Sequence, residues 1–146
     1  MRALLQRVTF GSVKVDDEIV GKINNGMVVL LGVHVDDLEE DTKYLAGKCA
    51  NVRIFNDENG NLNKSILETN GSALIISQFT LYGDARKGRR PGFSQAAPPE
   101  KANRLYELFI DEVRHLGIHV EHGVFGAMMK VEIHNDGPVT LLIESK

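Results

Sequence analysis

The sequence predicts an α+β fold in which a largely antiparallel, barrel-like β-sheet packs against two main helices. Short apolar segments rich in Val, Ile and Thr recur along the chain, and such residues favour strands. Turn signals separate these segments, and only two stretches have helical periodicity. Strict alternation of strand and helix is absent, which disfavours a doubly wound nucleotide-binding fold. The length suits one domain, so residues 1–146 are expected to form a single domain.

Four strands are expected before the first helix. Residues 3–10 and 12–15 are rich in Val, Leu, Thr and Phe, and the acidic turn at 16–18 leads into a strand at 19–23. After a second turn, residues 27–35 form a continuous apolar run with many β-branched residues. A run of this kind is typical of a strand that is covered on both faces.

The middle of the chain is expected to hold one helix, two strands and a long loop. Five carboxylates within residues 36–41 precede apolar residues at helical spacing, so a helix is expected at 37–50, with the acidic block as its capped, solvated first turn. Strands follow at 52–55 and 72–81. Residues 82–99 contain three of the four prolines, and an irregular segment of this length is usually functional or mobile.

The last third is expected to contain the second helix and three strands. A helix is expected at 98–116, because apolar residues recur there at helical intervals, with proline at its start and glycine just after its end. Strands are expected at 118–121, 127–134 and 139–143. The last two are separated by residues 135–138, where Asp-Gly is a hairpin signal.

Composition excludes several classes of protein. The formal net charge is −3, from 17 basic and 20 acidic residues, which argues against a protein that coats nucleic acid through bulk charge. Charge interrupts the first apolar residues, and no segment reaches the ~18 apolar residues that a membrane span needs. The one cysteine, Cys49, has no partner for an internal disulfide, and a core thiol is expected there. We therefore expect a cytoplasmic protein that does not enter a membrane.

No metal or cofactor is expected. The phosphate-loop, dinucleotide-binding and serine-hydrolase signatures are missing, and residues 36–41 lack the spacing of a calcium loop. His115, His119 and His122 lie close in sequence, but they span a change from helix to strand, so no single face presents them at a fixed ligand spacing. A metal-dependent hydrolase that uses these histidines stays as an alternative.

One candidate site lies where the strand at 72–81 becomes polar, just before the long loop. Three hydrogen-bonding side chains gather there, within the segment Ser77-Gln78-Phe79-Thr80. They suit the mouth of a pocket, where a hydroxyl can act as a nucleophile or as an orienting donor. No base lies nearby in sequence, which weakens a nucleophile mechanism. The alternative is an ordinary strand end that becomes polar as it leaves the core.

A second candidate is the segment Asn135-Asp136-Gly137-Pro138-Val139-Thr140. One interpretation is an ordinary hairpin connection. The other depends on the proline, because a bond before proline is the one peptide bond whose cis form costs only ~0.5 to 1 kcal/mol. A cis bond would present two carbonyl groups rigidly in one direction, as a backbone device that excludes groups by shape.

With these motifs, the sequence closely resembles the D-aminoacyl-tRNA deacylases. The resemblance runs nearly end to end, and its most specific parts are Ser77-Gln78-Phe79-Thr80-Leu81 and Asn135-Asp136-Gly137-Pro138-Val139-Thr140. Further matching segments are Met1–Val8, Arg53–Asp57 and Arg86–Pro91. Neither specific motif departs from the family pattern.

The resemblance implies a homodimer with two active sites at the subunit interface. Gly137 and Pro138 of one subunit, joined by a cis bond, would reach into the pocket of the other. Arg7 resembles the arginine of the family that helps to hold this pair, and Asn135 is expected to support it. L-amino acids are then expected to be rejected, because the carbonyls of the pair crowd the position that an L side chain would occupy.

The implied reaction is hydrolysis of the ester that joins a D-amino acid, or glycine mischarged on tRNA-Ala, to the terminal ribose of tRNA. Such an ester is already activated, and the vicinal 2'-hydroxyl can assist the attacking water, so positioning and oxyanion stabilisation can replace a triad. In the family the threonine of the first motif, here Thr80, has been considered as a nucleophile. We favour assistance by the RNA, with a site shaped by Ser77, Gln78, Phe79 and Thr80.

The resemblance also favours contact between tRNA phosphates and the basic residues of the long loop. These residues are Arg86, Lys87, Arg89 and Arg90. Cations of this kind bind the phosphate backbone irrespective of base sequence. The alternative is a solvated basic loop. For the whole chain, a binding module without catalysis is a further alternative, which the absence of a triad does not exclude.

Overall fold

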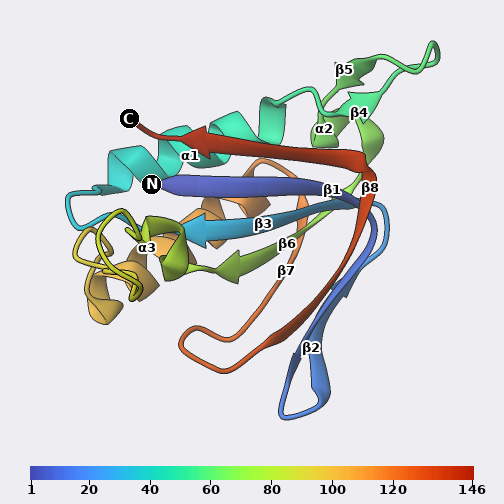
Figure 1. The fold of residues 1–146 in the computed structure, drawn as a ribbon. Coiled ribbons are helices and arrows are strands. Elements are labelled where there is room, and N and C mark those ends of the chain that lie inside the picture. The colour runs from blue at the N-terminus through green and yellow to red at the C-terminus, as the bar shows by residue number, and fades with distance from the viewer.

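The computed structural model describes all 146 residues, and Figure 1 shows a strongly curved sheet with its helices on one side. The strands are β1 (Arg2–Val15), β2 (Glu18–Ile23), β3 (Gly26–Gly32), β4 (Phe55–Asn56), β5 (Leu62–Lys64), β6 (Ser72–Ser77), β7 (His119–His122) and β8 (Lys130–Glu144). The helices are α1 (Glu39–Asn51), α2 (Ile66–Thr69) and α3 (Pro99–His115), with a 3₁₀ turn, η1, at Phe79–Tyr82. None of these helices combines the length and the apolar character needed to cross a membrane.

The main sheet has the strand order β2-β1-β3-β6-β7, and β8 also pairs with β1. All pairs made by β1 are antiparallel, whereas β3–β6 and β6–β7 are parallel. The parallel pairs arise because α1 and α3 lie in the connections between these strands, and a helical crossover returns the chain in the same direction. The two outer strands of this order, β2 and β7, come close to each other, because a Cβ on Gly21 of β2 would lie only 3.0 Å from the His122 carbonyl oxygen of β7. The α+β, barrel-like prediction is confirmed, with a mixed sheet.

Both predicted main helices are present. α1 begins two residues after its predicted start, and α3 begins at Pro99, where proline suits the first helical position. Cys49 lies on the buried face of α1, as expected for a core thiol. Burial raises the pKa of this thiol to about 12, so the folded protein holds it protonated and unreactive.

Two apolar clusters fill the fold, one on each face of the sheet. The larger has 25 buried residues and joins the helices to the sheet, with Leu45 of α1 and Phe109 of α3 at its centre. The smaller has six buried residues, among them Leu74, on the opposite face. Val28 belongs to the smaller cluster and Val29 to the larger, so β3 is covered on both faces as its continuous apolar run predicts.

Several predicted strand boundaries are wrong, and the strand predicted at 27–35 already ends at Gly32. The strands predicted at 3–10 and 12–15 form one strand, β1, and those predicted at 127–134 and 139–143 form one bent strand, β8, with no hairpin between them. The strand predicted at 72–81 ends at Ser77 and continues as η1. Only Phe55 of the strand predicted at 52–55 lies in a strand, because β4 pairs with β5 in a separate small sheet.

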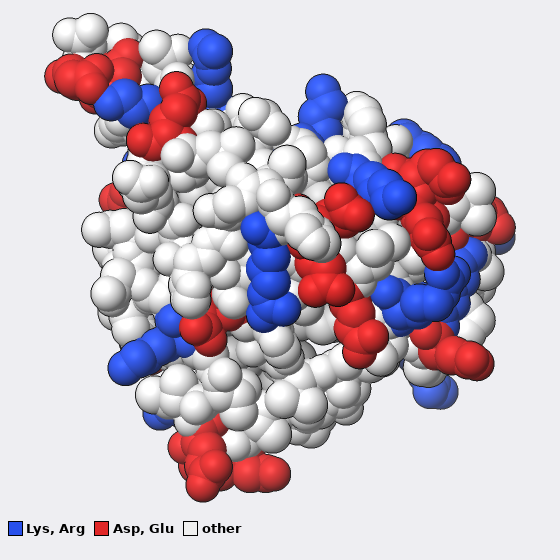
Figure 2. Space-filling view, turned by 180° about the vertical axis from the view of Figure 1, so that it is seen from behind, with Lys and Arg blue, Asp and Glu red and all other residues white.

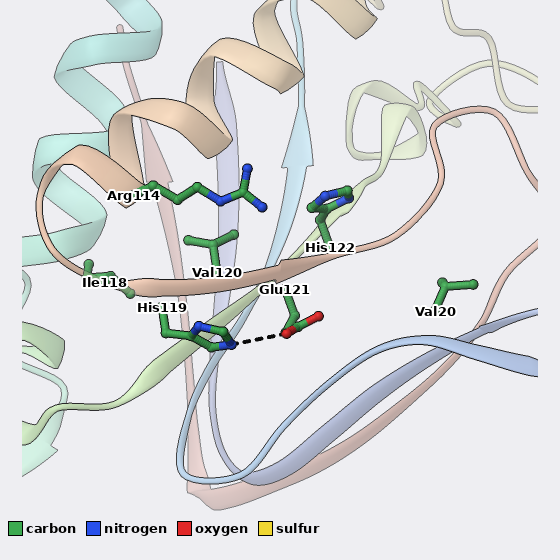
Figure 3. Close-up of a pocket in the computed structure, with 7 residues that line it drawn as sticks. All are labelled: Val20, Arg114, Ile118, His119, Val120, Glu121 and His122. Carbon is green, nitrogen blue, oxygen red and sulfur yellow. Dashed lines mark hydrogen bonds and ion pairs between the residues drawn. The ribbon is translucent and has the colours of Figure 1, made fainter.

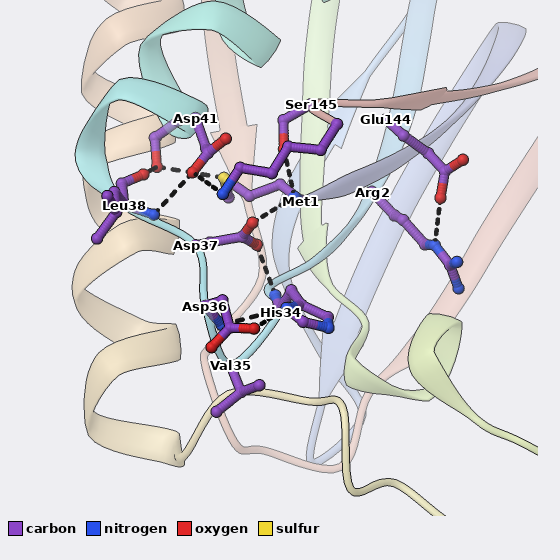
Figure 4. A network of polar contacts seen from close by, with 12 residues as sticks. Met1, Arg2, His34, Val35, Asp36, Asp37, Leu38, Asp41, Glu144 and Ser145 are labelled. Atoms are coloured by element: carbon purple, nitrogen blue, oxygen red, sulfur yellow. Dashed lines mark hydrogen bonds and ion pairs between the residues drawn. The ribbon is translucent and has the colours of Figure 1, made fainter.

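The two ends of the chain meet beside the start of α1 (Figure 4). The α-amino group of Met1 donates to Asp37 Oδ1 at 2.7 Å and to Ser145 Oγ at 2.6 Å. The other carboxylate oxygen of Asp37 accepts the backbone N–H of His34 at 2.6 Å. Asp37 is 1% exposed, so this part of the acidic block is a buried ion pair and not the solvated first turn that the sequence predicts.

Candidate active site

The first motif forms a turn over the end of β3. The Gln78 N–H donates to the Leu31 carbonyl at 2.8 Å, which extends the β3–β6 pairing by one residue before the chain turns into η1. Gly32 follows on β3, and a Cβ there would lie 3.2 Å from each of three atoms in the Gln78–Tyr82 segment. The absence of a side chain at Gly32 therefore allows η1 to sit directly on the sheet.

The side chains of this turn face outward. Phe79 is 54% exposed and packs edge-on against Phe93, with ring centroids 5.0 Å apart. Thr80 is exposed, Ser77 is half-buried, and the Gln78 amide donates to the Thr80 hydroxyl. This amide is the only side-chain partner of that hydroxyl, so no base of the same chain activates it.

Tyr82 closes the turn but offers no acid or base at neutral pH. Its side chain is 5% exposed, and burial raises the pKa of the phenol above its ordinary value. Its ring lies 5.2 Å from the ring of His34. The chemistry of the turn therefore depends on hydrogen bonding and shape.

The second motif is a bulge in β8. Thr140 pairs with Gln6 and Asn135 pairs with Val8, so the four residues 136–139 stand opposite the single residue Arg7 of β1. The Asn135 amide donates to the Arg7 carbonyl at 3.0 Å and to the Val139 carbonyl at 3.1 Å. The Asn135 amide thus links the far end of the bulge, at Val139, to Arg7 of β1 and closes the bulge on itself.

Arg7 supports the bulge from below. Its side chain is 9% exposed, and its Nε lies 3.0 Å from Asp136 Oδ2. One terminal nitrogen donates to the Ile54 carbonyl at 3.0 Å and to Asn56 Oδ1 at 2.9 Å. Gly137 has a φ of +116°, its peptide bond to the exposed Pro138 is cis, and a Cβ on Gly137 would lie 3.0 Å from the guanidinium.

The two motifs lie far apart within one chain. Ser77 pairs with Leu31, and Leu31 with Ala3, whereas Arg7 pairs with Met27. Four residues along β1 correspond to about 13 Å, and the three strand spacings from β6 to β8 add about 14 Å across the sheet. Figure 1 shows both termini at one end of the sheet, whereas the bend of β8 lies well away from them, before the sheet continues toward β2. The structure does not bring Thr80 and Gly137 together.

The basic loop is partly neutralised. Arg86 Nε donates to Asp84 Oδ1 at 2.9 Å and Arg86 Nη2 to Oδ2 at 2.7 Å. The hydrogen bonds from Arg86 lower the pKa of Asp84 to about 2, so the pair is ionised at neutral pH. Lys87, Arg89 and Arg90 are exposed. The sequence analysis missed Asp84, although an aspartate two residues before an arginine in a loop is a local pairing signal.

Charge elsewhere is mixed. Figure 2 shows acidic and basic side chains interspersed over one face of the molecule. The net charge of −3 is therefore not gathered into one patch on that face. The exposed cations of the basic loop are the better candidates for a local contact with a polyanion.

The histidines do not converge. His119 and His122 line a cavity of about 480 Å³ between β7, α3 and β2. They project from opposite faces of β7 (Figure 3), because side chains alternate along a strand. His119 Nε2 lies 3.1 Å from Glu121 Oε1 on its own face. This geometry therefore does not support a metal-dependent hydrolase, because His119 and His122 do not point toward a common metal ion.

The family model and the curated relatives point to the same family. The family model described as D-Tyr-tRNA(Tyr) deacylase matches residues 4–144. A curated relative from Fervidobacterium nodosum, named D-aminoacyl-tRNA deacylase, is 64% identical over 146 residues, which cover 100% of this chain and 98% of the relative. One from Bacillus pumilus with the same name is 59% identical and covers 100% and 99%.

Two solved structures have similar folds. The structure titled "c-Myc DNA Unwinding Element Binding Protein" has a TM-score of 0.94 at 39% identity, and the match covers 100% of this chain and 99% of the other. A structure titled as a probable eukaryotic D-amino acid tRNA deacylase has a TM-score of 0.86 at 22% identity, over 98% of both chains. At that identity the second match supports the fold alone.

Proposed function

The chain belongs to the D-Tyr-tRNA(Tyr) deacylase family and is an aminoacyl-tRNA ester hydrolase. We propose that η1 binds the ester of the substrate. We also propose that the Gly137–Pro138 bulge of a second subunit excludes L-amino acids. The observation that carries the proposal is that η1 and the Gly137–Pro138 bulge are both largely exposed but lie apart in one chain, level with Ala3 and Arg7 of β1 and on strands three spacings apart. Release of free D-tyrosine from D-tyrosyl-tRNA tests it. A tRNA substrate also supports a cytoplasmic location.

A homodimer would unite the two motifs. The outer edge of β8 has no neighbouring strand, although this strand is 15 residues long. Leu141 and Leu142 on β8 are 39% and 48% exposed. Long edge strands with exposed apolar side chains are usually covered in the native state. We therefore propose that a second copy packs along this edge and brings its bulge to η1.

The proposed reaction uses the RNA as a participant. Water attacks the carbonyl carbon of the ester, the bond from that carbon to the ribose oxygen breaks, and the ribose oxygen takes up a proton. The vicinal 2'-hydroxyl assists the water, because Thr80 has no base beside it. Gln78 and Thr80 are left to orient the ester, which supplies the positional part of catalysis.

We expect Thr80→Ala to retain substantial deacylation. The variant removes a hydroxyl that orients the substrate but does not attack it, so kcat should fall by about 10-fold or less. A D-tyrosyl-tRNA that ends in 2'-deoxyadenosine should react far more slowly with the wild-type protein. Both rates are measured as D-tyrosine released over time.

Thr80→Ser is the matched control, because it keeps the hydroxyl that Gln78 contacts. If Thr80→Ala abolishes the reaction while Thr80→Ser is active, and both bind tRNA normally, Thr80 is the nucleophile. Normal turnover of the 2'-deoxy substrate would contradict RNA assistance directly.

The proposed exclusion acts on configuration and not on side-chain identity. A D side chain points away from the carbonyls of the bulge, and glycine has no side chain to clash with them. We therefore propose that several D-amino acids are substrates, together with glycine mischarged on tRNA-Ala. The same geometry leaves correctly charged L-aminoacyl-tRNA intact.

The basic loop is proposed to contact tRNA phosphates through three of its four cations. Replacing Lys87, Arg89 and Arg90 together with glutamine should reduce the slope of log affinity against log salt by about 2. Arg86→Gln should change the slope much less, because Asp84 already pairs with Arg86. Titration of tRNA at several salt concentrations measures both slopes. Equal effects of the Arg86 variant and the triple variant would contradict this assignment.

A further inference from the structure

Arg2 connects η1 to both terminal strands (Figure 4 shows its pairing with Glu144). Arg2 Nη1 donates to the Leu81 carbonyl at 2.9 Å, and Nε donates to Glu144 Oε1 at 2.6 Å. The guanidinium carbon also lies 4.6 Å from the centre of the Tyr82 ring. Arg2 belongs to β1, Glu144 to β8, and Leu81 and Tyr82 to η1. One planar group on β1 therefore contacts two other elements, β8 and η1.

These contacts require an arginine. A guanidinium can donate in its plane to a carbonyl and a carboxylate while its face stacks on an aromatic ring. A lysine ammonium has no planar face, so it cannot hold all three groups in the same way. The guanidinium thus fixes the Leu81 carbonyl and the Tyr82 ring relative to the edge formed by β1 and β8.

The pair contributes little to stability. The side chains of Arg2 and Glu144 are 34% and 43% exposed, and ion pairs open to solvent stabilise a fold by less than about 1 kcal/mol. Two contacts that do not involve Arg2 also hold the turn. The ring of Tyr82 is buried, and the Gln78 N–H donates to the Leu31 carbonyl of β3. Loss of Arg2 should therefore leave the protein folded, and η1 should be able to shift about these two remaining anchors.

We propose that Arg2 is a positioning residue for deacylation, which sets the orientation of η1 through the Leu81 carbonyl and the Tyr82 ring. This inference rests on the proposed function, in which η1 binds the ester. Phe79 and Thr80 lie in the same four-residue turn, so a shift at its C-terminal end reaches the reacting centre. The contact with Glu144 also links η1 to β8, the strand that carries the bulge.

The test is a comparison of kcat and KM for D-tyrosyl-tRNA. Arg2→Ala should lower kcat by about 10- to 100-fold, because a misplacement near 1 Å costs that much, while KM stays near the wild-type value. Arg2→Lys should recover part of kcat, and Glu144→Gln should lose less than Arg2→Ala, because its amide oxygen still accepts from Nε. Thermal midpoints should stay within a few degrees of wild type.

Arg104→Ala is the matched control. Arg104 forms an exposed ion pair with Glu39 between α3 and α1, and it makes no contact with η1. This variant should keep both kcat and KM. Like Arg2→Ala, this variant removes an arginine from a solvent-exposed ion pair. A comparison of the two variants therefore separates the positioning of η1 from the general effect of removing a surface arginine.

The outcomes are distinguishable. Wild-type kcat in Arg2→Ala, or a rise in KM alone, would overturn the role of Arg2. If Arg2→Ala fails to fold, Arg2→Lys and Glu144→Gln decide the question, and wild-type kcat in both would overturn it. A wild-type protein that releases no D-tyrosine would refute the proposed function itself, whereas an active wild type with unaffected variants refutes only the role of Arg2.

Discussion

Gly137→Ala is expected to reduce discrimination between D- and L-tyrosyl-tRNA by about 10- to 100-fold. At a φ of +116° an L residue is strained, and the added Cβ would lie 2.9 Å from Val139 Cγ2 and 3.0 Å from Arg7 Nη2. Arg7 cannot move aside freely, because the Ile54 carbonyl and Asn56 hold it. The bulge must therefore shift, and its carbonyls leave the position from which we propose that they exclude an L side chain. Initial rates on the two substrates measure the ratio.

Gly60→Ala is the matched control for this prediction. Gly60 also has a positive φ, of +80°, but nothing lies within 4 Å of a Cβ at that position in the β4–β5 turn. It should carry a similar backbone strain and leave discrimination unchanged. The exclusion role fails if Gly137→Ala rejects L-tyrosyl-tRNA as the wild type does. The proposal that the bulge acts on the pocket of a second subunit fails if the protein sediments as a monomer and still discriminates between the two substrates.

Asp37→Asn is expected to lower the free energy of unfolding by about 3 to 5 kcal/mol. The carboxylate is 2% exposed and accepts from the Met1 ammonium at 2.7 Å, so the variant leaves a buried positive charge without its counterion. The same carboxylate accepts the His34 N–H, which fixes the turn before α1. Urea denaturation followed by circular dichroism measures the change.

Asp36→Asn is the control, because it makes the same chemical change at the neighbouring position. Asp36 is 82% exposed and lies 3.7 Å from His34 Nδ1, so its loss should cost less than about 0.5 kcal/mol. Equal unfolding midpoints for the Asp37 variant and the wild type would show that the buried pair contributes nothing. The Asp36 variant and the wild type should therefore have nearly the same free energy of unfolding in urea.

Local patterns in the sequence predicted the parts of the fold that depend on local physics. The apolar run of β3 indicated a strand covered on both faces, and the structure places Val28 and Val29 in separate clusters. The periodicity of α3 indicated its buried face, which includes Leu105 and Phe109. These predictions succeed because buried side chains recur about every second residue in a strand and about every 3.6 residues in a helix.

Contacts between distant residues were not predictable in this way. The Asp136-Gly137 pair indicated a hairpin, but β8 continues because β1 pairs with it on both sides of the bulge. The acidic block indicated a solvated helix start, yet Asp37 pairs with Met1 across 36 positions. Partners so far apart leave no periodic signal in a single sequence.

The candidate site residues were proposed from their motifs, while their arrangement was not predicted. Polar residues at the end of an apolar strand indicated a candidate site at Thr80, and the glycine-proline pair indicated a second one at Gly137, but neither the turn η1 nor the bulge in β8 was predicted. The distance between them emerges only from the register of β1 with its neighbours. Arg2 gave no signal, because its partners Leu81 and Glu144 lie 79 and 142 positions away.

The central claim is tested most directly by incubating the protein with D-tyrosyl-tRNA and L-tyrosyl-tRNA in parallel. The amino acid released is measured over time for both substrates under the same conditions. We expect rapid release of D-tyrosine, with L-tyrosine released no faster than in buffer alone. Equal release of both amino acids, or no release of either, would contradict the account.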